Sequence, residues 1–286
     1  MSRSRRERKD SVDVTVLAER AAWADVLEAA APETAAAATR EAAYATRFKK
    51  AGLGTRRAGA KGVFRRDAVA AARVGSQRYG GAPPPLKHAL PEVLMVGAAN
   101  AGKSTLINAL CGAAPASSAA PASASDRAGW TSGLEWIRVG AKPPVLYIVD
   151  APGYGSHAVA SPRERRDWSR LCAQYAATRA TLSAAVVVVD ATRGVCDEDR
   201  RELARLTATP RVIALSKCDL LQGPATVARC ARLVEEAVGG AAVVPTCGTT
   251  GAGVAELWAK LRALCAAAAV KQTDPRTVAV HRSAVL

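Results

Sequence analysis

Residues 97–104 read GAANAGKS, and this stretch decides the fold of the chain. It has the spacing G-x-x-x-x-G-K-[ST] of a phosphate-binding P-loop, and it lies between an apolar run, 93–96, and a helical pattern, 105–110. Glycines let backbone N–H groups approach phosphate oxygens, and the start of the following helix favours negative charge. Lys103 is expected to neutralise the β- and γ-phosphates, and Ser104 to ligate Mg²⁺. The stretch therefore predicts a nucleotide-binding α/β domain.

Downstream of Leu90 the chain alternates short apolar runs with helical patterns, which indicates a parallel sheet covered by helices on both faces. Strands are expected at residues 93–96, 134–139, 145–150, 185–190, 212–215 and 242–245. Helices are expected at residues 103–111, 163–182, 198–206, 224–238 and 254–266. The run 186–189, VVVV, is typical of a central strand that is buried on both faces. We therefore predict an α/β fold with a six-stranded, mainly parallel sheet around the P-loop, with the ligand at the carboxyl ends of the strands.

Two further motifs follow strands of this predicted sheet. Asp150 ends an apolar run and begins the pattern D-x-x-G that Gly153 completes, so the carboxylate can hold Mg²⁺ through water and the glycine N–H can contact the γ-phosphate. Residues 216–219, SKCD, resemble the [NT]-K-x-D guanine motif. The carboxylate of Asp219 can accept two hydrogen bonds from a guanine edge that adenine lacks, and the stem of Lys217 can cover the base. These motifs predict GTP rather than ATP as the nucleotide.

A third loop follows the last predicted strand and reads Thr246 Cys247 Gly248. It resembles the S-A-K loop of GTPases, in which a backbone N–H contacts guanine O6. An ordinary turn is an equally weighted alternative. In this order the motifs resemble those of Ras-like GTPases of the translation-factor class.

Finer residues resemble the YihA/EngB family of GTPases over residues 91–264. Four stretches carry the resemblance: GAANAGKSTLIN at 97–108 to GRSNVGKSSLIN, DAPGYG at 150–155 to DLPGYG, SDRAGWT at 125–131 to S-K-T-P-G-[KR]-T, and DATRG at 190–194 to D-x-R-x-G. The chain departs from the family in and near the switch, at Ala98, Ala128 and Trp130.

The resemblance implies a GTP-hydrolysing assembly factor for the large ribosomal subunit. Its partners would be a large-subunit precursor, with rRNA and ribosomal proteins, and other assembly factors, and it would be a monomer away from the ribosome. Motifs and resemblance together assign catalysis to Lys103, Thr131 and Gly153, and Mg²⁺ to Ser104, Thr131 and Asp150. The expected nucleotide contacts are Asn100, Ala101, Gly102, Lys103, Ser104, Thr105, Lys217, Asp219, Thr246, Cys247 and Gly248.

Two residues bear on turnover. Asn100 matches the P-loop Asn that helps to hold K⁺ in related potassium-activated GTPases, so K⁺ is a candidate cofactor beside Mg²⁺ and GTP or GDP. Tyr154 occupies the place of the water-orienting Gln of Ras-type enzymes, so intrinsic turnover should be slow. A nucleotide-bound scaffold or RNA-binding module of the ribosome, with little or no turnover, therefore stays open as the alternative function.

Segments near the site are expected to respond to the nucleotide. Residues 113–125 are rich in Ala, Ser and Pro, so they should stay loose until the γ-phosphate, Mg²⁺ or a ribosomal surface fixes Thr131. Arg163, Arg165 and Arg166, which follow the D-x-x-G motif, either contact rRNA or begin an ordinary solvated helix.

The chain is strongly basic, and the charge is uneven. Its formal net charge is +15 over 286 residues, and residues 1–90 contain 18 Lys and Arg against 9 Asp and Glu. Such a balance indicates a polyanionic partner such as RNA or an anionic membrane surface. Residues 1–89 are predicted to form a basic extension outside the nucleotide fold, with Ala-rich helices at 13–30 and 33–50. The basic segment 48–66 suits RNA, with a solvated linker as the alternative.

The proline run 83–85 marks the expected boundary, which leaves a GTPase domain at 90–268 and a tail at 269–286 that is either disordered or a second ribosome contact. Bacterial members of the family lack a long basic leader, so the resemblance favours a mitochondrial protein, with plastid and cytoplasm as alternatives. No apolar run approaches the roughly 18 residues that span a bilayer, and the C-terminus offers no Cys for prenylation, so no membrane role is expected. The seven cysteines form no C-x-x-C pair and are expected to be buried hydrophobes in a reducing compartment.

Overall fold

The structure is a computed structural model that describes residues 5–30, 34–50, 53, 71–113, 120–122, 133–140, 145–155 and 161–273. Three predicted features lie outside these residues: the switch at 125–131 with Thr131, most of the basic segment 48–66, and most of the tail, beyond residue 273. Among the residues that are described, none of the helices combines the length and the apolarity that a bilayer crossing requires.

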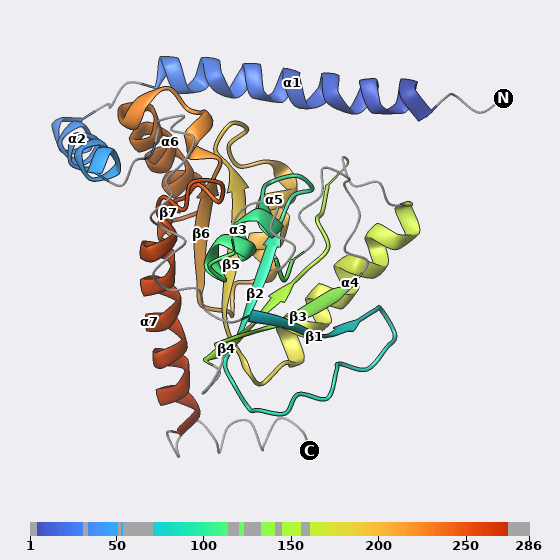
Figure 1. Ribbon diagram of the computed structural model, residues 1–286. Coiled ribbons are helices and arrows are strands. Elements are labelled where there is room, and N and C mark those ends of the chain that lie inside the picture. Colours follow the sequence, from blue (N-terminus) through green and yellow to red (C-terminus); the bar gives the residue numbers. More distant parts are fainter. Residues whose placement is uncertain are drawn as a thin grey trace.

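Within the described ranges one sheet forms the centre of the molecule, with the strand order β1-β3-β4-β2-β5-β6-β7 (Figure 1). The strands are β1 (Ala71–Gln77), β2 (Glu92–Gly97), β3 (Leu134–Val139), β4 (Leu146–Asp150), β5 (Leu182–Asp190), β6 (Arg211–Ser216) and β7 (Val243–Pro245). Strands β4, β2, β5, β6 and β7 pair in parallel, whereas β3 is antiparallel to both of its neighbours. The prediction of a mainly parallel sheet is confirmed, and each of the six predicted strands is present. The predicted number of strands is wrong, because the described sheet contains a seventh strand.

The additional strand, β1, comes from the segment that was predicted to lie outside the nucleotide fold. Its sequence, AARVGSQ, has neither an apolar run nor strict alternation, and a register shift between Arg73 and Gly75 interrupts its pairing with β3. Such an edge strand depends on hydrogen bonds to its neighbour more than on its own side-chain pattern. The sheet therefore begins before residue 90, the predicted start of the GTPase domain.

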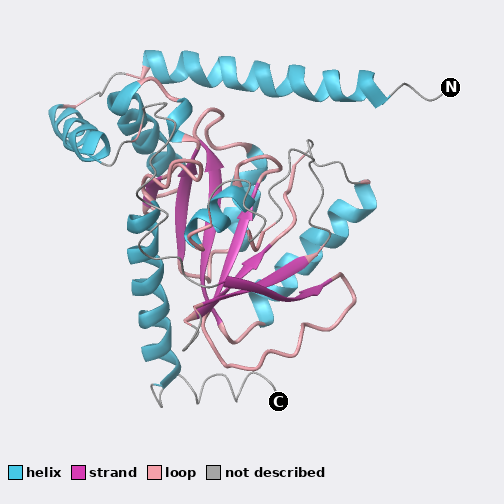
Figure 2. Cartoon of the chain, viewed as in Figure 1, coloured by secondary structure: helices cyan, strands magenta, loops and turns pink. Residues whose placement is uncertain are grey.

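Helices cover both faces of the sheet (Figure 2). The helices are α1 (Arg5–Ala29), α2 (Ala35–Lys50), α3 (Lys103–Leu110), α4 (Pro162–Thr178), α5 (Asp197–Arg205), α6 (Gly223–Ala237) and α7 (Val254–Thr273), with a 3₁₀ turn η1 (Cys218–Leu220). Helices α4, α5 and α6 pack on one face, and α3 and α7 pack on the other. Strand β5 serves both cores, because Val187 points to the first and Val186 and Val188 point to the second.

The two Ala-rich helices predicted in the N-terminal segment are confirmed as α1 and α2, and both pack against the outer side of α6 (Figure 1). Leu27 and Phe48 are buried in the same core as the inner residues of α6. This part of the predicted extension is therefore packed on the GTPase domain.

Candidate nucleotide-binding site

The P-loop connects the end of β2 to the start of α3, as its sequence predicts. Asn100 and Gly102 both have a positive φ, 64° and 88°, which turns the loop tightly before Lys103 begins the helix. Gly97 has no room for a side chain, since a Cβ there would lie 2.8 Å from the carbonyl oxygen of Val188. Ser104 and Thr105 occupy the first turn of α3 and are half-buried. The loop thus presents backbone N–H groups at a helix N-terminus, where a phosphate binds best.

A buried ion pair lies under the P-loop. The Nζ of Lys103 donates to Oδ1 of Asp150, and the two side chains are only 7% and 1% exposed. The second carboxylate oxygen of Asp150, Oδ2, is buried and has no hydrogen-bond partner among the described residues. A buried carboxylate oxygen without a donor fits a hard cation or its water shell, and the Ser104 hydroxyl is of the same ligand type. The residues present therefore fit Mg²⁺, to which Asp150 and Ser104 were assigned.

A second acidic residue, beside this pair, was missed by the sequence analysis. Glu135 on β3 is the antiparallel partner of Asp150 on β4, and its side chain forms an ion pair with Arg73 of β1. Burial raises the pKa of Glu135, and the nearby Asp150 adds to this effect while Arg73 opposes it. The additional strand β1 therefore supplies a positive charge close to the expected Mg²⁺ site. No sequence motif marks the pair, because its members lie 62 residues apart.

The backbone of the D-x-x-G motif lies directly against the P-loop. The Ala99 N–H donates to the Tyr154 carbonyl at 2.8 Å, and a Cβ on Gly153 would lie 2.9 Å from the Ala99 Cα. Only glycine permits this close approach, which places the Gly153 N–H near the phosphate-binding loop. The geometry is that expected of a residue that contacts the γ-phosphate.

The Tyr154 side chain is held away from this contact. Its hydroxyl donates to Oδ1 of Asp199 on α5 at 2.6 Å, and its ring packs against both cores. Burial, together with the Asp199 charge, raises the pKa of Tyr154 well above its ordinary value, and burial likewise raises the pKa of Asp199. The hydroxyl is thus a neutral donor that ties the segment after β4 to α5.

The predicted guanine loop follows β6 and is fastened to the P-loop. The Ser216 hydroxyl oxygen lies 2.5 Å from the Ala101 carbonyl oxygen and 3.1 Å from that of Val189, so this serine braces the P-loop. The [NT]-K-x-D motif, which this loop resembles, has Asn or Thr at the same position. Lys217 has a left-handed backbone, φ 57°, and its Nζ donates to the Asn100 carbonyl as well as to Asp190.

The two residues assigned to the base lie at the end of this loop. Asp219 is half-buried in η1, and its carboxylate has no hydrogen bond among the described residues, which leaves both oxygens available as acceptors. The stem of Lys217 lies 3.7 Å from the point where a Cβ on Gly102 would be. The residues assigned to the guanine base and those assigned to the phosphates therefore lie together at the carboxyl ends of β2, β4 and β6.

Of the three backbone N–H groups in the third predicted loop, two have partners among the described residues. The Thr246 N–H donates to the Leu215 carbonyl at 2.7 Å, and the Cys247 N–H donates to the Ala252 carbonyl at 2.9 Å. The Gly248 N–H has no backbone partner among the described residues, and Gly248 approaches Thr105 and Leu106 at the start of α3. Of the three residues, Gly248 is thus the one placed to donate to a base carbonyl.

The sequence-predicted residues from Asn100 to Thr105, with Asp150, Gly153, Lys217, Asp219 and Gly248, come together at one edge of the sheet. Because a carboxylate suited to guanine shares this edge with a P-loop lysine and an aspartate suited to Mg²⁺, the fold and the site define a P-loop GTPase. A family model described as "50S ribosome-binding GTPase" matches residues 92–217. The chain belongs to the EngB family of GTP-binding proteins, and it is a GTPase that binds GTP and GDP.

The family membership rests on sequence relatives. A probable GTP-binding protein EngB from Nitratidesulfovibrio vulgaris (strain DP4) is 34% identical over 181 residues, which is 62% of this chain and 78% of the relative. A probable GTP-binding protein EngB from Burkholderia cenocepacia (strain HI2424) is 37% identical over 134 residues, or 46% of this chain and 58% of the relative.

Two solved structures are also similar. The crystal structure of a probable GTP-binding protein engB has a TM-score of 0.48 and 18% identity, and the match covers 61% of this chain and 98% of that one. The structure of Era in complex with MgGDPNP and nucleotides 1506-1542 of 16S ribosomal RNA has a TM-score of 0.49 and 21% identity, with 60% and 55% coverage.

Proposed function

We propose that this GTPase is an assembly factor for the large ribosomal subunit that binds pre-ribosomal rRNA in its GTP state and leaves after hydrolysis. The observation that carries the proposal is a GTPase site that lies beside a basic surface on α4, because Gly153, Tyr154 and Gly155 line one hollow together with Arg165 of that helix. GTP hydrolysis at the site would change the conformation of the protein, and the basic surface would bind a polyanion such as rRNA.

Each residue of the site would have its own role in GTP binding and hydrolysis. Lys103 and the P-loop N–H groups would hold the β- and γ-phosphates, and Ser104 and Asp150 would hold Mg²⁺, which neutralises phosphate charge when bound. Gly153 would donate its N–H to the γ-phosphate. Thr131 would complete these contacts, and Asn100 would add K⁺ as a further cation. Because the Tyr154 hydroxyl is bound to Asp199, this position supplies no water-orienting group, and we expect slow intrinsic turnover.

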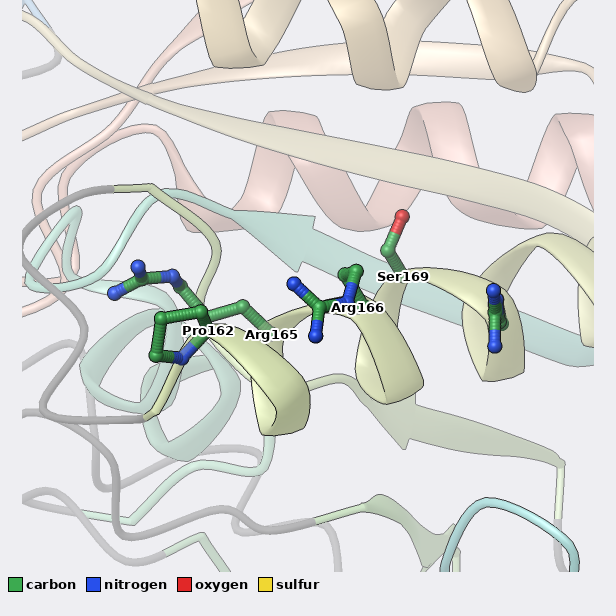
Figure 3. A pocket seen from close by; sticks show the side chains of 5 residues that line it. Pro162, Arg165, Arg166 and Ser169 are labelled. Atoms are coloured by element: carbon green, nitrogen blue, oxygen red, sulfur yellow. The ribbon is translucent and has the colours of Figure 1, made fainter.

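The basic surface consists of Arg163, Arg165, Arg166 and Arg170 on α4. A shallow hollow on this helix is lined by Pro162, Arg165, Arg166, Ser169 and Arg170. Figure 3 labels the first four of these side chains. Arg166 and Arg170 are exposed and have no acidic partner among the described residues. The neighbouring Glu164 is engaged in a capping box, where it accepts hydrogen bonds from the Ser161 N–H at 2.8 Å and hydroxyl at 2.7 Å.

This surface suits RNA phosphates. Arginine presents a planar set of donors that matches phosphate oxygens, and several on one helix face give a strongly positive patch. Helix α4 begins soon after Gly155, so a rearrangement of the D-x-x-G segment on hydrolysis would move the arginines. The nucleotide state would thereby set the affinity for rRNA.

The test is co-sedimentation with large-subunit precursors in the presence of a non-hydrolysable GTP analogue, GDP or no nucleotide, at two salt concentrations. We expect selective pelleting with the analogue, and we expect the double variant R166E/R170E to lose it. K260E/R262E on α7, on the opposite face of the sheet, changes the net charge by the same amount and is the matched control, which should pellet like the wild type. Equal pelleting in all three states, lost uniformly as salt rises, would instead mean phosphate attraction without a switch.

The engagement of the Tyr154 hydroxyl favours a second candidate function, a nucleotide-bound scaffold with little or no turnover. S104A distinguishes the two, because it removes a Mg²⁺ ligand while leaving the arginines in place. Assembly that proceeds normally with this variant would support the scaffold.

We further propose a mitochondrial location, with plastid or cytoplasm as the alternatives, supported by the basic N-terminal segment. Because Leu27, Phe48 and Leu53 are buried in the core, any transit peptide that is removed should end before α1 reaches Leu27. Imaging of the tagged full chain, with N-terminal sequencing of the mature protein, tests both points. A mature N-terminus beyond Leu27 would contradict the second point, the predicted end of the transit peptide.

A further inference from the structure

Helices α1 and α2 are anchored on α6, the helix that follows the guanine loop. The carboxylate of Glu41 on α2 is buried between Arg229 and Arg232 of α6, at 3.3 Å from each. The same two arginines donate to carbonyl groups at the end of α1, to Leu27 at 2.8 Å and to Ala30 at 3.2 Å. The two arginine–carbonyl contacts fix the direction in which α1 leaves α6, whereas Glu41 fastens α2.

From this anchor α1 passes over the loop that follows β5, residues 190–194. The indole Nε1 of Trp23 donates to the Ala191 carbonyl at 3.0 Å, and Glu19 accepts a hydrogen bond from Arg193 at 2.9 Å. Gly194, with φ 68°, lies under the Trp23 ring so closely that a Cβ would be 2.7 Å from it. The helix and the loop are therefore fitted to each other by two polar contacts and one steric one.

The loop carries Asp190, which connects α1 to the base-recognition residues. Asp190 is almost fully buried, and its Oδ2 lies 2.8 Å from the Lys217 Nζ and 3.6 Å from a guanidinium nitrogen of Arg20 on α1. Its Oδ1 accepts hydrogen bonds from the Thr192 N–H at 2.9 Å and hydroxyl at 2.7 Å. Burial by itself raises the pKa of Asp190, but Lys217 and Thr192 hold it below its ordinary value, so the carboxylate stays charged. Lys217 and Arg20 thus share one buried anion.

We propose that Glu19, Arg20 and Trp23 of α1 are positioning residues for guanine recognition. They hold the 190–194 loop, and through Asp190 they hold Lys217 in the left-handed conformation from which its stem covers the base beside Asp219. The inference rests on the proposed assignment of Lys217 and Asp219 to the base. It gives part of the N-terminal segment a direct role in nucleotide affinity, in addition to any contact with RNA.

The experiment measures release of a fluorescent GDP analogue from the full chain by stopped flow, for R20M and W23L. We expect dissociation to accelerate about fivefold for R20M and about tenfold for W23L, in the lower part of the range for coupling between two sites. Maximal GTP turnover at saturation should be unchanged while KM rises, because the γ-phosphate contacts are untouched. The preference for GDP over IDP, which lacks the 2-amino group that Asp219 would bind, should also fall.

The matched control is E41Q, which weakens the anchoring of α2 on α6 without contacting the 190–194 loop. It should lower Tm and leave the dissociation rate and the GDP preference as in the wild type. Unchanged dissociation rates in both R20M and W23L would overturn the inference. It would also be overturned if the dissociation rates of R20M, W23L and E41Q all rose in proportion to their loss of Tm. D219A separates this from the assignment on which it rests: if D219A binds GDP normally, Asp219 does not recognise the base, whereas loss of GDP binding in D219A with normal R20M and W23L refutes the role of α1 alone.

Discussion

Replacing Glu92 by Gln tests the buried charge that holds helix α4 to the sheet. Glu92 begins β2 and is fully buried. Its carboxylate accepts hydrogen bonds from four side chains: Trp136 Nε1 at 2.8 Å, Tyr175 hydroxyl at 2.6 Å, Thr181 hydroxyl at 2.5 Å, and Arg179 Nε and Nη2 at 2.9 and 2.5 Å. These partners come from β3, from the end of α4 and from the residues that lead into β5, so one anion joins four parts of the fold.

The expected loss follows from this geometry. Gln preserves the volume and one acceptor oxygen, but its amide group points N–H donors at side chains that are themselves donors. Breaking a buried charge pair costs about 3–5 kcal/mol. Since the Arg179 side chain is 25% exposed and can turn to water, the loss should lie at the lower end, at about 3 kcal/mol. For a domain of this size that is a fall in Tm of about 6–12 °C.

The same carboxylate predicts a pH dependence. Although burial by itself raises the pKa of Glu92, the hydrogen bonds from Arg179 and the three other donors hold it below its ordinary value of 4.5. A folded-state pKa that is lowered stabilises the protein above the unfolded-state pKa, and this stabilisation disappears as the pH falls through the folded-state value. The difference in unfolding free energy between wild type and E92Q should therefore be full at neutral pH and should shrink below pH 4.5.

Urea unfolding followed by circular dichroism measures this difference at pH 7 and at the lowest pH where the wild type stays folded. E28Q, at an exposed position of α1, is the matched control and should unfold like the wild type at both pH values. The reasoning is refuted if E92Q lies within about 1 kcal/mol of the wild type at pH 7, the range of an ordinary substitution. It also fails if the difference does not shrink at low pH.

Substitutions at three further positions give additional tests. S216A should weaken GDP binding about tenfold, because the P-loop carbonyl of Ala101 loses its hydroxyl donor, and S216T should restore the affinity. Equal GDP affinities of S216A and the wild type in a titration would show that Ser216 does not brace the P-loop. Y154F should lower the free energy of unfolding in urea by about 1–3 kcal/mol, because Oδ1 of Asp199 loses its donor while Oδ2 keeps Cys196. GTP turnover should stay nearly unchanged, and a large fall in turnover would mean that the hydroxyl is catalytic. G194A should cost at least about 1–2 kcal/mol from its positive φ and should displace Trp23, which limited proteolysis of α1 would detect; an intact, protected α1 would argue against the steric fit.

Local sequence patterns were sufficient for the GTPase core. The run of valines in β5 predicted a strand buried on both faces, because apolar side chains that alternate in direction must find cover on both sides. The P-loop, Asp150 and Asp219 were found because each lies at a fixed offset from the end of a strand, and parallel strands bring their carboxyl ends together. Thr131 lies outside the described residues, and its role stays a prediction.

Tertiary structure decided how distant segments join this core. β1 has no pattern of its own and becomes a strand through pairing with β3. Trp23 meets the carbonyl of Ala191 across 168 positions of the chain, and Arg73 meets Glu135 across 62, so neither pair leaves a periodic signal in the sequence. The sequence by itself therefore determined the nucleotide chemistry, which depends on short spacings. Only the packed chain decided which charges are buried together, because burial of a polar group requires a partner that folding brings from elsewhere.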